Sequence, residues 1–190
     1  MTRLVSAFFL SRLDTCNAII AELPRSTLVP LQRVHNGVAR LVLELKLRDH
    51  LTSAYHQLHW LHVWQKIEYK LCLLSHLAVT GKSPAYLASL LTTAKSRGST
   101  SRSATEKMFI PRTRLRQGEW AFSIASPRQW NRLAPEIHCI SNTEQFKLHL
   151  KTFLFKSQIV DVLKTFVLLF WFSGKLRYIN VRFIGSRALA

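Results

Sequence analysis

The stretch FIPRTRLRQGEWAFSIASPRQWNRLAP, residues 109–135, decides how we expect the chain to be organised, because it fits neither a regular helix nor a regular strand. Its first half carries three arginines at alternate positions: Arg112, Arg114 and Arg116. Alternate side chains share one face of an extended segment, and guanidinium groups bind phosphate oxygens well. This half of the stretch therefore predicts an extended segment with a phosphate-binding face.

The second half of the stretch predicts a short helix. Ser126 is a favourable N-cap, and Pro127 is a favourable first helical residue. We expect this helix to run to about Leu133 and to stop at Pro135. The aromatic residues near it are Trp120, Phe122 and Trp130. They could stack on nucleic-acid bases, but for the two tryptophans we favour a place in the core, where paired aromatic residues anchor a helix.

Helical periodicity covers most of the remaining chain. The expected helices lie at residues 4–20, 26–45, 51–61, 63–80, 84–91 and 141–156. In the second of these, Ser26 is the expected N-cap, and Gly37 predicts either a close backbone approach or the loss of a better residue. The apolar side of this helix is expected to consist of Leu28, Leu31, Val34, Val38, Leu41, Val42 and Leu45.

Two local signals mark further helix ends. Gly81 fits the C-terminus of the fourth expected helix. Ser141 and Glu144 form a capping-box pattern at the start of the last one. The apolar face of that last helix is expected to consist of Phe146, Leu150, Phe153 and Leu154.

Composition and element order together predict a mainly α protein: a small helical domain with a basic loop and one short extended segment. A chain of 190 residues that is 48% hydrophobic can bury one core. The expected regions are a helical region at 1–91, a basic Ser/Thr-rich linker at 92–107, an extended segment with C-terminal helices at 108–156, and a hydrophobic and basic tail at 157–190.

The charge balance predicts a polyanionic partner. Lys and Arg outnumber Asp and Glu by 27 to 10, a net charge of +17, which favours RNA, DNA or an anionic membrane. The densest basic region is 95–116, and the alternative to a binding site there is an ordinary solvated loop. The candidate phosphate-binding residues are Arg97, Arg102, Lys107, Arg112, Arg114 and Arg116, and the candidate base-stacking residues are Trp120, Phe122 and Trp130.

Patterns typical of catalysis are missing from the sequence. No two of the ten acidic residues are closer than five positions, and there is neither a nucleophile elbow nor a glycine-rich phosphate loop. We therefore expect no enzyme activity and no cofactor. One set of residues has a zinc-like order, His59 and His62 followed by Cys72 and His76. We expect no metal there, with the histidines exposed or packed beside Trp60 and Trp64 and the cysteine in the core.

The three cysteines are widely spaced and include no CxxC pair, so they predict neither a disulfide framework nor a zinc ribbon. A reducing compartment, nuclear or cytoplasmic, is the corresponding expectation, and we do not expect a secreted protein. The apolar run near the N-terminus is too short, and too soon followed by charge, for a signal peptide.

The residues PRTRLRQGEWAFSIASPRQWNRLAPEI resemble a segment near the C-terminal end of the polyprotein of non-LTR (LINE-type) retrotransposons, downstream of the reverse transcriptase domain. Segments at 10–42, 49–91 and 144–155 resemble the same region in the same order, so the resemblance covers about residues 3–156. It implies that the polymerase carboxylates and the endonuclease lie outside this chain. It also implies a non-catalytic role in holding template RNA or target DNA.

Several positions depart from the pattern of that family. His62 stands where the family tends to have Pro, Trp64 replaces a usual Arg, and Gln129 replaces a usual Leu. The usual Asn-Ser-Leu-Pro is lengthened by one residue, at 131–135. These departures predict a degenerate copy, and the basic composition is also what a decayed reading frame would give.

The tail at 157–190 lies outside the resemblance. Its longest uncharged run, 165–174, is shorter than the ~20 residues that a membrane-spanning helix needs. The alternative function is therefore that of a small basic membrane-associated protein, in which residues 159–172 contact the membrane surface beside anionic lipid.

Overall fold

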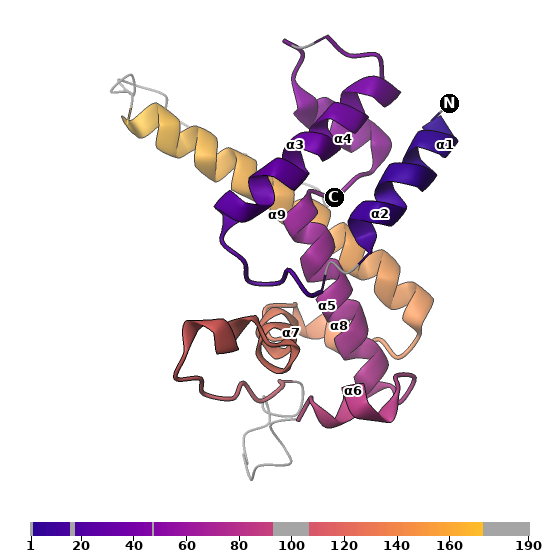
Figure 1. Ribbon diagram of the computed structural model, residues 1–190, viewed down its shortest axis with the longest axis vertical. Helices are drawn as coiled ribbons and strands as arrows, with labels where there is room; N and C mark the ends of the chain where they lie inside the picture. Colours follow the sequence, from indigo (N-terminus) through magenta and orange to yellow (C-terminus); the bar gives the residue numbers. More distant parts are fainter. Residues whose placement is uncertain (1, 16–17, 47, 93–106, 173–190) are drawn as a thin grey trace, which may run out of the picture. The chain divides into compact units, whose positions relative to one another are not determined.

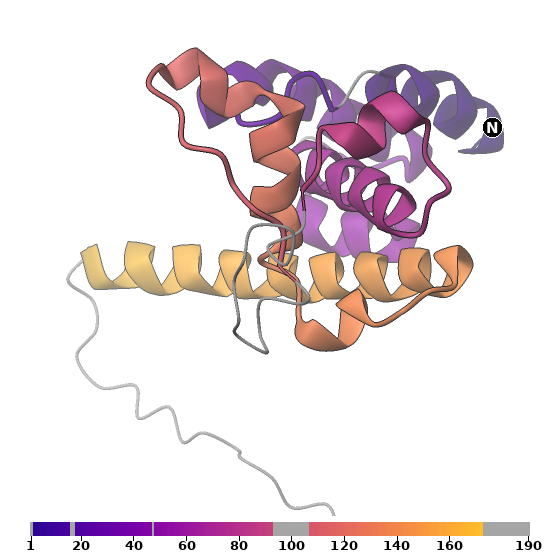
Figure 2. The same cartoon turned by 90° about the horizontal axis from the view of Figure 1, so that it is seen from below.

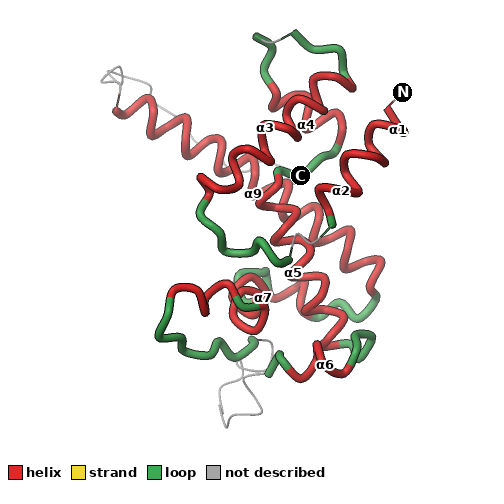
Figure 3. Tube along the Cα trace, in the orientation of Figure 1, coloured by secondary structure: helices red, strands yellow, loops and turns green. Residues whose placement is uncertain are grey.

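The computed structural model describes residues 2–15, 18–46, 48–92 and 107–172, and it is drawn as ribbon and trace in Figures 1 and 3. Helices make up 66% of this part of the chain, and no strand occurs in it. The prediction of a mainly helical protein is therefore confirmed. The chain divides into two compact units, Met1–Leu154 and Phe155–Ala190.

The described residues contain α-helices, a π-helix and a 3-10 helix. Their bounds are α1 Thr2–Val5, the π-helix η1 Ser6–Leu10, α2 Ser11–Asp14, α3 Arg25–Val42, α4 Leu51–Leu58, α5 Val63–Val79, α6 Ala85–Ser89, the 3-10 helix η4 Arg116–Trp120, α7 Phe122–Trp130, α8 Pro135–His138 and α9 Thr143–Phe172. Helix α5 is the central element of the first unit, since it packs against α3, α6 and α7 (Figures 1 and 2).

One apolar side of α5 forms the main core. Val63, Ile67 and Leu71 recur every four residues along it and are at most 5% exposed. They cluster with Leu28 of α3 and Ala125 of α7. Because these three helices share one buried cluster, the position of α7 depends on the packing of α5.

Helix α7 begins earlier than the sequence predicts. Ser126 and Pro127 lie inside it, and Ala121 is its N-cap. The Ser126 hydroxyl is fully buried, lies 2.5 Å from the Ser75 hydroxyl of α5, and donates to the Leu71 carbonyl oxygen at 3.3 Å. The prediction of a Ser126 N-cap is wrong, because this side chain joins two helices.

The end of α7 also differs from the expected boundary. The helix stops at Trp130, and Leu133 lies in the following turn. Pro135 occupies the first turn of α8, a position where its missing N–H costs no helical hydrogen bond. Pro135 therefore begins a helix.

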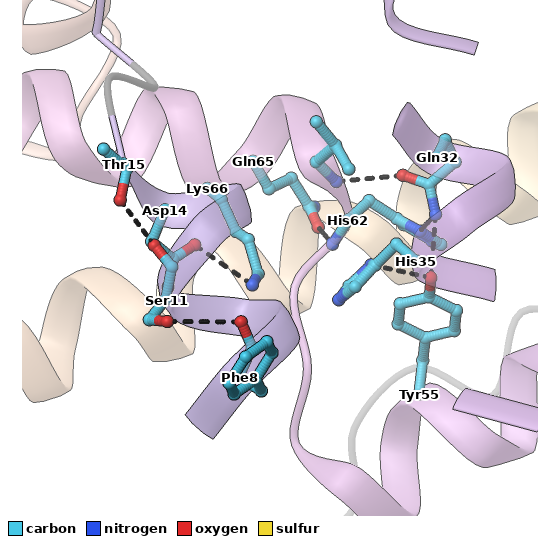
Figure 4. Close-up of polar contacts among 11 residues, drawn as sticks. Phe8, Ser11, Asp14, Thr15, Gln32, His35, Tyr55, His62, Gln65 and Lys66 are labelled. Atoms are coloured by element: carbon cyan, nitrogen blue, oxygen red, sulfur yellow. Dashed lines mark hydrogen bonds and ion pairs between the residues drawn. The ribbon is translucent and has the colours of Figure 1, made fainter. Parts of the chain in front are cut away.

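A buried polar network ties α3, α4 and the start of α5 together (Figure 4). The Gln32 amide nitrogen donates to the Tyr55 hydroxyl at 2.8 Å, and the Gln32 amide oxygen accepts from the Val63 N–H at 2.9 Å. The Tyr55 hydroxyl donates to Asn36 Oδ1 at 2.7 Å and lies 2.9 Å from His35 Nδ1. This arrangement places a proton on His35 Nδ1, so that Tyr55 accepts from the ring and donates to the amide.

Burial keeps the ring of His35 neutral. Its side chain is fully buried and stacks on Trp60 with ring centroids 5.2 Å apart. Removal from water, with smaller effects from the charges of Lys66 and His62, lowers the pKa of His35 to about 3. Removal from water also lowers the pKa of His62 to about 4 and raises that of Tyr55.

The network changes which side of α3 is buried. Val34 and Leu41, both expected on the apolar side, are 50% and 61% exposed, whereas His35 and Ala39 are fully buried. The predicted face is thus wrong at those two positions, because the helix turns Gln32, His35 and Asn36 towards α4. The helix starts at Arg25 after Pro24, so the expected Ser26 cap is also wrong.

The structure confirms the prediction for Gly81 but not the close backbone approach expected at Gly37. Gly81 follows the C-cap of α5 with φ +70°, the left-handed conformation expected of a helix-ending glycine. Gly37 is exposed, and a Cβ there would meet no atom within 4 Å. The expected close backbone approach at Gly37 is therefore not present within the described residues.

The apolar face of α9 is confirmed. Phe146 and Leu150 are fully buried and Leu154 is 4% exposed, while Phe153 is partly buried. The cap is different, because the Asn142 side-chain oxygen accepts from the N–H groups of Glu144 and Gln145 at 2.9 and 3.4 Å. Asn142 therefore caps the helix in place of the expected Ser141.

We expect Leu150→Ala to lower the free energy of unfolding by about 2 to 5 kcal/mol, because it leaves a cavity at a fully buried position. The matched control is Leu148→Ala on the same helix, 69% exposed, which should change it by less than about 0.5 kcal/mol. Denaturant unfolding followed by circular dichroism measures both. Equal effects of the two variants would contradict the assigned face of α9.

The buried histidines predict acid sensitivity. Below pH 6.5 the unfolded chain binds protons at His35 and His62, which the folded chain does not bind, so stability falls with falling pH. Each histidine contributes a slope of up to about 1.4 kcal/mol per pH unit between about pH 6 and pH 4. His62→Asn keeps a good N-cap without a titrating group. The unfolding free energy of this variant should therefore depend less steeply on pH than that of the unsubstituted protein. An unchanged slope would show that His62 titrates alike in both states.

Candidate nucleic-acid interface

Residues 107–120 form the part of the basic region that the structure describes, and we call them the basic segment. Hydrogen bonds hold the start of this segment beside the end of α7. Met108, 4% exposed, donates its N–H to the Asn131 side-chain oxygen at 2.8 Å and accepts from the Asn131 side-chain nitrogen at 2.9 Å. The next residue, Phe109, donates its N–H to the Thr92 carbonyl oxygen at 2.9 Å. The Asn131 amide thus pairs with Met108 as a neighbouring strand would, which positions the residues that follow.

The segment turns into η4 through a close approach. A Cβ added at Gly118 would lie 3.0 Å from the Thr113 side-chain methyl group. The Gly118 N–H also donates to the Leu115 carbonyl oxygen at 3.0 Å, which closes a turn. Gly118 therefore lets residues 113–118 fold closely together.

Three of the predicted phosphate-binding side chains are displayed to solvent. Lys107, Arg112 and Arg114 are exposed, and none of them takes part in an ion pair among the residues that the structure describes. By contrast, the Arg128 guanidinium lies 3.0 Å from the Glu22 carboxylate. Positive charge on the basic segment is therefore available to a phosphate group without breaking an ion pair.

The side chains of the other three predicted cations lie outside the part of the chain that the structure describes. Arg97 and Arg102 lie outside the described residues. Arg116 is the first residue of η4, and its side chain is likewise outside the described part. The expectation that Arg112, Arg114 and Arg116 share the face of one extended segment is wrong for Arg116, because the 3-10 helix begins there.

The aromatic candidates have three different environments. Trp130 is 2% exposed and stacks on His138 and Phe146 with ring centroids 4.8 and 5.9 Å apart. Phe122 is partly buried against the main core. Trp120, which we expected in the core, is 36% exposed. Burial removes Trp130 from the residues that could stack on a base and leaves Trp120 as the most accessible of the three.

The zinc-like set of residues is spread over separate environments. His62 stacks on Trp64 with ring centroids 4.4 Å apart, and His76 stacks on Phe146 at 4.0 Å. Cys72 is buried, and burial raises the pKa of its thiol. Within the described ranges no three His, Cys, Asp or Glu side chains gather into a group that could hold a metal ion.

The region proposed from the sequence for membrane contact, 159–172, forms the C-terminal half of α9 in the second unit. None of the helices within the described ranges combines the length and the apolar character needed to cross a membrane.

One of these features could not be recognised from the sequence. The contact between Asn131 and Met108 joins residues 23 positions apart, and neither residue type is distinctive of such a contact. The exposed arginines, in contrast, follow from local composition alone.

Comparison of the chain with family models, with curated proteins and with solved structures gave no match.

We expect Asn131→Ala to release the start of the basic segment, because it removes both hydrogen bonds to Met108. The amide of Met108 should then exchange with solvent faster, by a factor that corresponds to about 1 to 2 kcal/mol. Arg132→Ala is the matched control, since its guanidinium reaches Gln129 within the same turn. Site-resolved hydrogen exchange measures the effect, and unchanged protection of Met108 in the Asn131 variant would contradict the assigned contact.

Proposed function

We propose that this chain is a non-catalytic C-terminal segment of a retrotransposon reverse transcriptase polyprotein, in a degenerate copy, that binds RNA or DNA through its basic segment. The observation that carries the proposal is the exposure of Lys107, Arg112 and Arg114 beside a fixed backbone anchor at Met108. The family origin rests on the ordered sequence resemblance over residues 3–156.

The chemistry of the basic segment suits a nucleic-acid backbone better than a small ligand. Its three exposed cations lie within eight residues of chain and have no carboxylate among the residues between them. Phosphate contacts of this kind give affinity without sequence specificity. Trp120, close by in the chain and 36% exposed, could add stacking on an unpaired base.

Salt dependence provides the test. In the triple variant Lys107→Ala, Arg112→Ala and Arg114→Ala, the slope of log affinity against log salt should fall by roughly 0.7 to 0.9 for each phosphate group that the variant no longer binds. The control removes three exposed cations elsewhere, in Arg33→Ala, Lys46→Ala and Arg48→Ala. Fluorescence anisotropy with a single-stranded RNA and a duplex DNA of equal length measures both slopes.

The outcomes separate the proposal from its alternative. A lower slope in the first variant alone supports the assignment, whereas equal slopes in both variants would assign the binding to net charge. Removal of residues 158–190 tests the membrane alternative, because binding to anionic vesicles should then disappear while RNA or DNA binding persists. Loss of nucleic-acid binding with the tail would place the binding site outside residues 107–120.

A further inference from the structure

A second basic site lies on a different part of the first unit. A cavity of about 350 Å³ is bounded by the N-terminal helical segment, the connection from α4 to α5, α5 itself and the start of α9. Three lysines line it: Lys66 and Lys70, one turn apart on α5, and Lys151 on α9. The one acidic residue that lines it is Asp14 of α2.

The electrostatics of this cavity favour an anion. Lys66 pairs with Asp14 at 3.1 Å, and the side chain of Lys66 is 13% exposed (Figure 4). Burial and the nearby charge of Lys151 lower the pKa of Lys66, although Asp14 opposes this shift. With three ammonium groups and one carboxylate, the lining carries a net charge of +2, so a bound anion would relieve the repulsion between the lysines.

The remaining walls are apolar and aromatic. Trp60 and Leu61 are buried side chains that close one side of the cavity, and Tyr69 of α5 is partly exposed to it. A volume of 350 Å³ lies at the lower end of the range of about 300 to 1,000 Å³ found for small-molecule sites. The cavity therefore has room for one charged group together with one ring.

We propose that this cavity binds a phosphate group carried on an aromatic moiety, as in a nucleoside monophosphate. Lys66, Lys70 and Lys151 contact the phosphate as point charges, and Trp60 and Tyr69 contact the ring. The proposal is independent of the proposed function, because none of these residues belongs to the basic segment at 107–120.

The ligand could be a free nucleotide or the terminal nucleotide of a nucleic acid, and both present the same chemistry. Isothermal titration of the full chain with adenosine 5′-monophosphate, with adenosine as the phosphate-free control, tests the free ligand. A short single-stranded oligonucleotide with a 5′-phosphate, compared with its 5′-hydroxyl counterpart, tests the terminal nucleotide. Phosphate-dependent binding in either comparison supports the proposal, and its absence from both would overturn it.

Substitutions in the cavity locate the binding. Lys70→Gln and Lys151→Gln alter exposed side chains, and each should weaken binding roughly three- to tenfold. Asp14→Asn removes the carboxylate that repels an anion, so it should tighten binding, a change in the direction opposite to that of a merely damaging substitution. Lys46→Gln, at an exposed lysine that does not line the cavity, is the charge-matched control and should leave the affinity unchanged. Equal losses in Lys46→Gln and Lys70→Gln, or weaker binding in Asp14→Asn, would overturn the assignment to this cavity.

Discussion

The first unit depends on how the buried first turn of α5 satisfies its backbone N–H groups. These groups have no partner within the helix, and leaving them unpaired away from water would cost free energy. Gln32 of α3 accepts from the Val63 N–H, and the His62 side chain accepts from the Gln65 N–H. The Gln65 side chain is 1% exposed and donates to the Leu154 carbonyl oxygen of α9 at 2.9 Å. One helix end therefore fixes α3 on one side and α9 on the other.

This constraint explains why the sequence predicts the helices better than their orientation. Hydrophobic periodicity identifies α5 and the face of α9 because Ile67, Leu71, Phe146 and Leu150 are spaced as a buried helix face requires. The same reasoning assigns Val34 to the core. It fails there because α3 is turned by polar side chains whose partners lie 19 to 31 positions away, and hydrophobicity carries no signal for such contacts. The expected cap at Ser126 fails for a related reason, since a local cap preference competes with a buried contact to α5.

In the candidate interface, too, some features could be predicted from the sequence and others depend on tertiary packing. Clustering of positive charge is a local property, so Lys107, Arg112 and Arg114 follow from the sequence alone. Exposure of an aromatic side chain is decided by tertiary packing, so Trp120 and Trp130 could not be told apart before the structure placed one outside the core and the other against Phe146. The lysine-lined cavity requires two helices to meet, and Lys151 is distant in sequence from Lys66. The sequence by itself therefore presents those lysines as ordinary surface charge.

The residues that depart from the proposed retrotransposon pattern make contacts of their own. His62 and Trp64, two of the substituted positions, stack on one another, and the Arg25 guanidinium lies 5.4 Å from the centre of the Trp64 ring. His62 in addition caps α5, a role that a proline side chain cannot fill. A third substituted residue, Gln129, donates to the Glu22 carboxylate at 3.3 Å. Because these residues make contacts with the side chains around them, their departure from the proposed family pattern does not by itself argue against a folded chain.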